Sequence, residues 1–134
     1  MEFLAVTGVE DLLQDNVLGT IEKLRQAGIS IWMLTGDKIE TARCIAISTG
    51  LKDHRQGIFE MREMNEVRQI EDEIRLYNNN VSSKMLMIDG STLDFILERE
   101  MLSQEFFSVA SKAESVCICR CSPNQKAKVA ELIR

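Results

Sequence analysis

The sequence predicts an α/β domain built on a parallel sheet with helices on both of its faces. Short apolar runs alternate with segments whose apolar residues recur at helical spacing, which is typical of strands joined by crossover helices. The 134 residues are 45% hydrophobic, which suits one compact domain over residues 1–134. No apolar run approaches the roughly 20 residues of a membrane span, so we expect a soluble domain.

The first part of the chain predicts two pairs of a strand followed by a helix. Residues 3–6 form a short apolar run, and a helical repeat follows, with Asp15 placed to cap its start and Gly28 to end it. Residues 29–34 are apolar and rich in β-branched side chains, which indicates a buried strand. Apolar positions at helical spacing then predict a second helix over residues 39–50.

Residues 52–83 read as a variable insertion that carries one amphipathic helix. Residues 52–57 are polar and predict a loop. A narrow apolar stripe from Met61 to Tyr77 follows on an otherwise charged helix. We expect this stripe to face the core, and the alternative is that it forms a binding face for a partner protein.

The last part of the chain predicts two more strands and the helices that follow them. Strands are expected over residues 85–88 and 116–119, with a helix over residues 104–113 between them. Ser91 or Thr92 can cap a helix after the first strand, and Ser122 can cap a last helix that begins at Pro123.

Charge and cysteine content narrow the classes of partner and ligand. The formal net charge is −5, which does not favour nucleic acid or an anionic membrane surface. Cys117, Cys119 and Cys121 alternate, so on a strand they would share one face. That spacing is a poor zinc chelate, and we therefore expect reduced structural thiols and no metal site within the chain.

A first candidate site follows the strand predicted over residues 29–34. Ligands of open α/β sheets bind at the carboxyl ends of parallel strands, where helices begin. Thr35 offers a hydroxyl donor there, and Gly36 allows a close approach of the backbone to a ligand. Asp37 can cap the next helix, or face a ribose or a metal-bound water. An anion site at the helix start is one interpretation, and an ordinary turn is the other.

A second candidate site follows the strand predicted over residues 116–119. Lys126 falls in the first turn of the next helix, where a cation opposes the helix dipole, and a bound anion would remove that penalty. Arg120 can bind a phosphate or a ribose hydroxyl with its guanidinium group. The alternative is that both residues are solvated surface cations.

Four blocks in the same order carry a resemblance to a known family. They are Thr-Gly-Val-Glu-Asp at residues 7–11, Ile-Trp-Met-Leu-Thr-Gly-Asp-Lys at 31–38, Ile-Asp-Gly-Ser-Thr-Leu at 88–93 and Cys-Arg-Cys-Ser-Pro-Asn-Gln-Lys at 119–126. Together they resemble the phosphorylation domain of P-type ATPases, which has the haloacid-dehalogenase fold. The variants are most similar to the phospholipid flippases of type IV, in the endosomal and Golgi Neo1-like branch.

The resemblance implies a role for each candidate residue. Thr35 would contact the transferred phosphoryl group, and Lys126 would neutralise charge on its oxygens. Gly36 and Asp37 would lie against the nucleotide and the metal region, and Arg120 would contact the nucleotide. The parent enzyme would use ATP and Mg²⁺ to move phospholipid between membrane leaflets through an aspartyl-phosphate intermediate. It would be a multi-pass endosomal or Golgi membrane protein, with this domain facing the cytosol, and it could have an accessory subunit.

Two motifs of the family do not occur in this chain. The nucleophile motif Asp-Lys-Thr-Gly-Thr is absent, and so is the Gly-Asp-Gly segment that supplies the magnesium carboxylate. We therefore expect a Rossmann-like sheet that lacks its nucleophile strand, and a fragment without ATPase activity. The gap predicts an open sheet edge, marginal stability or self-association. The competing interpretations are a small-molecule phosphatase of the same superfamily and a non-catalytic interaction module that uses the 61–77 helix.

Overall fold

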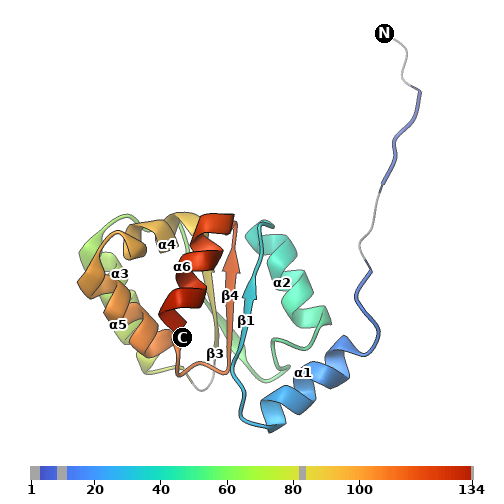
Figure 1. Cartoon of the computed structure of the whole chain (residues 1–134), viewed down its shortest axis with the longest axis horizontal. Coiled ribbons are helices and arrows are strands. Elements are labelled where there is room, and N and C mark those ends of the chain that lie inside the picture. The colour runs from blue at the N-terminus through green and yellow to red at the C-terminus, as the bar shows by residue number, and fades with distance from the viewer. Residues whose placement is uncertain (1–3, 9–11, 82–83, 134) are drawn as a thin grey trace.

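A parallel sheet surrounded by helices makes up the body of the molecule (Figure 1). The computed structural model describes residues 4–8, 12–81 and 84–133. The described helices are α1 (Val17–Gln26), α2 (Ile39–Ser48), α3 (Val67–Asn78), α4 (Gly90–Leu97), α5 (Glu100–Ala110) and α6 (Pro123–Ile133). The described strands are β1 (Ile31–Leu34), β2 (Gly57–Met61), β3 (Lys84–Asp89) and β4 (Ser115–Cys119).

The sheet has the strand order β1-β4-β3-β2, and every pair of neighbouring strands is parallel. Parallel neighbours need crossover connections, and helices supply them here. The predicted α/β class with helices on both faces is thereby confirmed, and it is consistent with a Rossmann-like fold of the haloacid-dehalogenase type.

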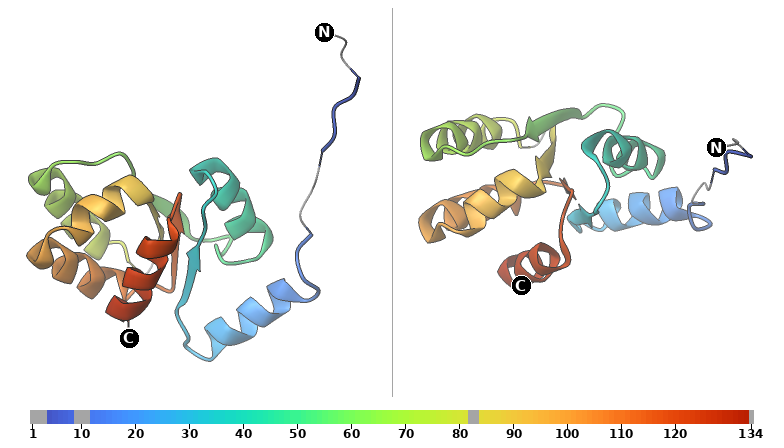
Figure 2. Two further views of the ribbon diagram at one scale, coloured as in Figure 1. Left: turned by 45° about the horizontal axis from the view of Figure 1, so that its top comes forward. Right: turned by 90° about the horizontal axis from the view of Figure 1, so that it is seen from above.

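The larger core lies on the face of the sheet that α3, α4, α5 and α6 cover (Figure 2). Leu86 and Ile88 project into this face from β3, because alternate residues of a strand point the same way. Trp32 projects to the same face from β1, and its ring stacks on that of Phe107 with a centroid separation of 6.1 Å. This core ties most of the helices to the central strands.

A smaller core lies on the opposite face, under α2. The small residues Ala42 and Ala46 are fully buried and let the helix approach the strands closely. Cys117 and Cys119 lie in this core, as predicted for alternating residues of a strand. Cys121 was expected on the same face, but it packs into the larger core. The reason is that Cys121 lies beyond the end of β4, after a turn at Arg120 that has a φ of 50°.

The segment 52–83 departs most from the sequence-based prediction. Residues 57–61 form β2, an edge strand paired with β3, where a loop and the start of a helix were expected. The helix begins only at Val67, so the prediction that it starts near Met61 was wrong. Phe59 and Met61 supply the buried side chains of this strand. The interpretation of residues 52–83 as a variable insertion stays a prediction.

The apolar stripe of α3 faces the core, as expected. Ile70, Ile74 and Tyr77 are each at most 2% exposed. The Tyr77 hydroxyl donates a hydrogen bond of 3.0 Å to the carbonyl of Lys84, at the start of β3. These buried contacts leave a mostly polar face of α3 to solvent, with Val67 and Leu76 as its exposed large apolar residues.

The beginning of the chain also differs from the prediction. Among the residues expected as a strand over 3–6, residue 3 lies outside the described part, and residues 4–6 form no strand. Asp15 does not cap α1, because Asn16 takes the N-cap position in a left-handed conformation without a side-chain cap. Gly28 ends helix α1 as predicted. It follows the C-cap residue Ala27 and has a positive φ of 75°, which glycine tolerates.

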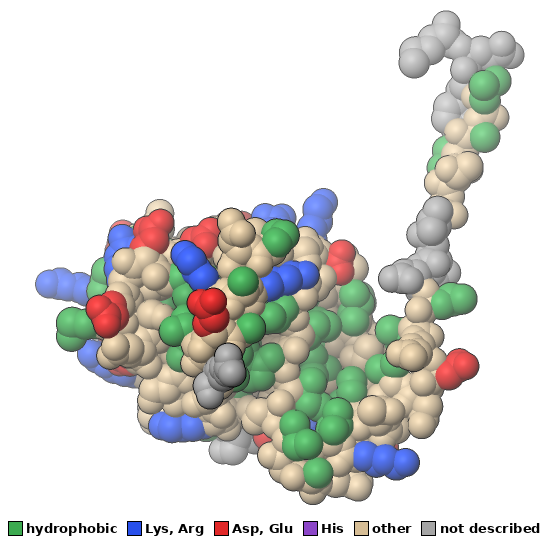
Figure 3. Space-filling model, in the orientation of Figure 1, with side chains coloured by type: hydrophobic (Ala, Val, Ile, Leu, Met, Phe, Trp, Pro, Cys, Tyr) green, Lys and Arg blue, Asp and Glu red, His purple; other side chains and the backbone are tan. Residues whose placement is uncertain are grey.

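Strand β1 forms an open edge of the sheet. Its ladder joins it to β4 alone within the described residues, and all four of its side chains are only partly buried. Helix α1, which lies near the start of β1, buries none of its residues. Figure 3 shows hydrophobic side chains gathered over β1, α1 and the adjacent part of α2. The fold therefore leaves apolar surface uncovered on this side.

Candidate functional site

The two candidate sites of the sequence lie on neighbouring strands, and their loops are bonded to one another. Leu34 is in register with Ile118 at the carboxyl ends of β1 and β4. Beyond these residues the backbone N–H of Arg120 donates to the carbonyl of Asp37, and that of Cys121 donates to the carbonyl of Thr35, both at 2.8 Å. The Thr35–Asp37 turn and the Arg120 turn therefore form one edge.

The Thr35–Asp37 turn is closed by its own side chains. The Thr35 hydroxyl donates to a carboxylate oxygen of Asp37 at 2.6 Å and accepts from the backbone N–H of Asp37 at 3.1 Å. The hydroxyl proton that a phosphoryl group would need is thus directed at Asp37. A ligand at Thr35 has to replace the carboxylate as the acceptor, and Asp37, being exposed, can rotate away.

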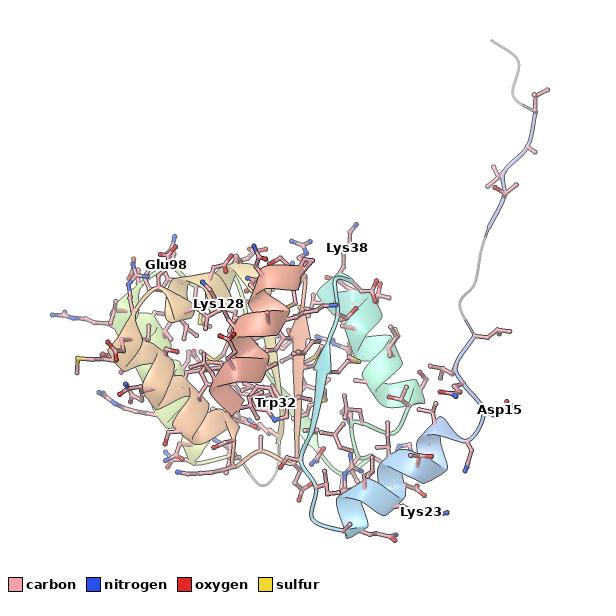
Figure 4. All side chains as sticks on the ribbon, in the orientation of Figure 1. Asp15, Lys23, Trp32, Lys38, Glu98 and Lys128 are labelled. Atoms are coloured by element: carbon pink, nitrogen blue, oxygen red, sulfur yellow. The ribbon has the colours of Figure 1, made fainter. Side chains whose placement is uncertain are left out.

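Helix α2 begins directly after this turn with its N-terminus open. Asp37 was expected as a possible cap, but Lys38 holds the N-cap position and makes no side-chain cap. The first backbone N–H groups of α2 therefore have no side-chain acceptor among the described residues, and they present the positive end of the helix dipole to solvent. Lys38 extends from the same edge, away from the body of the molecule (Figure 4).

Helix α6 begins at the same edge of the sheet, and its start is capped. Ser122 holds the first turn as predicted, because its hydroxyl accepts from the backbone N–H of Gln125 at 3.3 Å. Pro123 takes the first helical position, where a missing N–H costs nothing. Lys126 follows in this first turn and is half-buried.

Arg120 and Lys126 are cations without a partner among the described residues. Within residues 4–8, 12–81 and 84–133, neither side chain takes part in an ion pair or a hydrogen bond. Arg120 also adopts a left-handed φ of 50°, which non-glycine residues rarely do. Strain of this kind clusters at functional sites. The two free cations and the open start of α2 make this edge a favourable environment for an anion.

The sequence-based prediction missed Gln125, which connects the loops that follow β3 and β4. Its side chain is 4% exposed. The amide nitrogen donates to the carbonyl of Gly90 at 2.7 Å, and the amide oxygen accepts from the backbone N–H of Ser122 at 2.6 Å. A polar residue one position before a candidate lysine was the available signal, but its burial depends on tertiary packing.

Gly90 is required at this junction for a steric reason. A Cβ atom at residue 90 would lie 2.3 Å from the carbonyl oxygen of Arg120, closer than Cβ atoms approach other atoms. Only glycine lets the start of α4 come this close to the Arg120 turn. The pair of Gly90 and Gln125 thus holds the Arg120 turn in place from the β3 side.

Asp89 is a structural carboxylate at the end of β3. The structure makes it the N-cap of α4, in place of the expected Ser91 or Thr92. Burial raises the pKa of Asp89, but hydrogen bonds from Thr92, from Ser91 and from the backbone N–H of Glu63 outweigh it and lower the pKa overall. All of these donors hold the carboxylate in its ionised form.

The described residues fit an anion better than they fit a metal ion. Among them, no three or more carboxylate, histidine or cysteine side chains form a group that could hold a metal. Anionic oxygens match the donors, which are the N–H groups of α2 and the cations Arg120 and Lys126. No helix in the described part of the chain is long and apolar enough to cross a membrane.

The comparison with known proteins agrees with the four sequence blocks. The chain is 44% identical over 134 residues to phospholipid-transporting ATPase neo1 of Schizosaccharomyces pombe. Over its whole length, the chain is similar to one segment of the type IV phospholipid-transporting P-type ATPases. It is also 43% identical to phospholipid-transporting ATPase NEO1 of Saccharomyces cerevisiae and 42% identical to "Probable phospholipid-transporting ATPase IIB" of Homo sapiens. The resemblance to phospholipid-transporting ATPases that the sequence blocks indicated is therefore confirmed.

The similarity covers only a small part of each relative, and this limits which of the relatives' properties can be assigned to this chain. Each of these alignments covers 100% of this chain but only 11% to 13% of the relative, so the chain spans about an eighth of the length of these ATPases. No family model matches the chain. The likeness therefore concerns one segment of a larger ATPase, and the activity of the whole protein enters below as a proposal.

Proposed function

We propose that this chain is part of the phosphorylation domain of an ATP-driven phospholipid-translocating ATPase and binds the nucleotide and its transferred phosphoryl group. The observation that carries the proposal is the joint edge of β1 and β4, where Thr35 lies beside the open start of α2 and two cations lack partners among the described residues. Relatives that bear the name phospholipid-transporting ATPase supply the reaction class.

In this proposal, each side chain has a distinct electrostatic task. Thr35 transfers its hydroxyl hydrogen bond from Asp37 to a phosphoryl oxygen. Lys126 neutralises the charge that builds on the phosphoryl oxygens in the transition state. Arg120, Gly36 and Asp37 lie against the nucleotide. Lys126 lies in the first turn of α6, where its charge opposes the helix dipole, and a bound phosphoryl group would remove that repulsion.

The reacting aspartate and the magnesium carboxylate would come from other segments of the full-length ATPase. We propose that the strand with the nucleophile pairs with the open edge of β1, since this places its end next to Thr35 and makes β1 an internal strand. The chain alone would then lack ATPase activity. While the strand is missing, the β1 edge is proposed to mediate self-association.

The remaining features of the parent are also proposals from the family resemblance. They are phospholipid as the transported substrate, an accessory subunit, and residence in endosomal or Golgi membranes with this domain facing the cytosol. The alternative of an interaction module on the 61–77 helix finds less support, because Ile70, Ile74 and Tyr77 are buried and leave that helix no continuous apolar face to offer.

The proposal is tested in the full-length ATPase with Lys126→Ala and a matched control. Lys128→Ala removes a cation two residues along the same helix, on the side toward α4 and α5 and away from the candidate site (Figure 4). We expect Lys126→Ala to lower ATP hydrolysis by roughly a hundredfold or more, as for the loss of one transition-state donor. Equal activities of the two variants would contradict the role of Lys126.

A further inference from the structure

The open edge of β1 offers a defined set of unpaired backbone groups. The N–H of Ile31 donates to Glu114 and that of Thr35 donates to Ile118, so these residues and Met33 face β4. Backbone groups alternate along a strand, and the N–H and C=O groups of Trp32 and Leu34 therefore point outward. Their outer side has no strand partner within the described residues.

The same chain contains an extended apolar segment without partners among the described residues. Residues 4–8 read Leu-Ala-Val-Thr-Gly and form no helix or strand. Leu4 is 89% exposed and Val6 is 82% exposed. No hydrogen bond joins residues 4–8 to another described residue. Figure 1 shows the segment extending away from the body of the molecule, far from its own β1.

We propose that residues 4–8 of one copy pair with the β1 edge of a second copy, in a reciprocal strand exchange. This inference rests on the self-association proposed above and names the donor segment. An unpaired strand edge accepts only extended backbone, which excludes the exposed apolar residues of helix α1 as donors. Leu4 and Val6 share one face of an extended segment, so both enter the same apolar layer beside β1. When each copy donates its residues 4–8 to the β1 edge of the other copy, both β1 edges are paired and the assembly closes as a dimer.

Trp32 provides an internal reporter for this exchange. It is the single tryptophan of the sequence, and it lies partly exposed on β1, the strand whose edge residues 4–8 of the second copy would pair with (Figure 4). We expect a shift of its emission to shorter wavelength as protein concentration rises, together with a mass twice the 15.2 kDa of one chain by light scattering. The proposal would be overturned if the chain stayed monomeric, with constant Trp32 emission, up to about millimolar concentration. That concentration is about the effective concentration that a short flexible linker provides.

Sequence variants distinguish strand exchange from nonspecific hydrophobic association. Deletion of residues 1–8, or Ala5→Pro, which removes an N–H and fixes φ, should each abolish the dimer. Leu4→Ser with Val6→Ser should weaken dimerisation at least tenfold. Leu12→Ser with Leu13→Ser changes side chains that are also 86% and 51% exposed, and it should leave the dimer intact. A dimer that survives the deletion, or that only the Leu12 and Leu13 changes abolish, would refute the exchange.

The proposed pairing of residues 4–8 with β1 can be tested independently of the nucleotide site. Residues 4–8 make no contact with the Thr35–Asp37 turn through a hydrogen bond, so the deletion variant should respond to a non-hydrolysable ATP analogue as the parent chain does. Adding a peptide of residues 1–8 to the deletion variant should restore the Trp32 shift without restoring the dimer. Failure of this restoration would argue against pairing at β1 whatever the outcome for nucleotide binding.

Discussion

Gln125→Ala is the substitution for which the structure predicts a specific loss of stability. The side chain is buried and donates to Gly90 at 2.7 Å while it accepts from Ser122 at 2.6 Å. Each hydrogen bond contributes on the order of 1 kcal/mol, and the truncated methylenes leave a small cavity. Together these terms predict that the free energy of unfolding falls by about 2–3 kcal/mol.

Urea denaturation of Gln125→Ala measures this loss, and Gln69→Ala is the matched control. Gln69 lies on the exposed side of α3, so the same substitution there should change the free energy of unfolding by less than about 0.5 kcal/mol. The denaturant slopes of both variants should equal that of the parent chain, because the fold is unchanged. A loss below about 0.5 kcal/mol for Gln125→Ala would refute the view that its amide connects the two loops.

Three further outcomes follow from the same contacts. Gly90→Ala should lower the free energy of unfolding by about 2 kcal/mol or more, measured in urea, because its Cβ would meet the Arg120 carbonyl at 2.3 Å; an unchanged stability would contradict this. Iodoacetamide at about pH 8 should label Cys44 in the native chain and spare Cys117, because burial raises the pKa of Cys117 to about 12; rapid labelling of Cys117 would be inconsistent with this. Asp89→Asn should lower the free energy of unfolding by about 1 kcal/mol at neutral pH, because the asparagine NH2 group cannot accept the hydrogen bonds that Ser91 and the backbone N–H of Glu63 donate to Oδ2. Since the folded-state pKa of Asp89 is lowered, its stabilisation exists above the unfolded value, and the gap between Asp89→Asn and the parent should close as pH falls through the folded pKa.

The elements with strong local signals were predictable from the sequence. β1, β3 and β4 are apolar runs bounded by turn residues, and they lie within or close to the expected ranges. The rule for open α/β sheets predicted that the loops after β1 and β4 meet at one edge, and the hydrogen bonds between these loops agree with it. The roles of Thr35 and Lys126 stay predictions. The four sequence blocks indicated a resemblance to phospholipid-transporting ATPases, and the relatives confirm that resemblance.

The incorrect or incomplete sequence-based predictions share a physical cause. At these positions tertiary contacts, and not the local sequence pattern, determine the structure. β2 contains Glu60 between buried Phe59 and Met61, and only pairing with β3 makes it a strand. The role of Gln125 depends on two loops that are distant in sequence from one another. Residues 4–6 have a strand-like composition but no neighbour to pair with among the described residues of a single copy. Such features depend on partners that a local window of sequence does not contain.

The central claim is that Thr35 and Lys126 serve one anion, and an NMR titration of the chain tests it most directly. Inorganic phosphate and a non-hydrolysable ATP analogue would each be added while backbone amide signals are followed. We expect the signals of Thr35, Gly36 and Lys126 to move together along one binding curve, and Lys126→Ala to weaken the curve read at Thr35. Shifts confined to α3, or separate curves for Thr35 and Lys126, would contradict it.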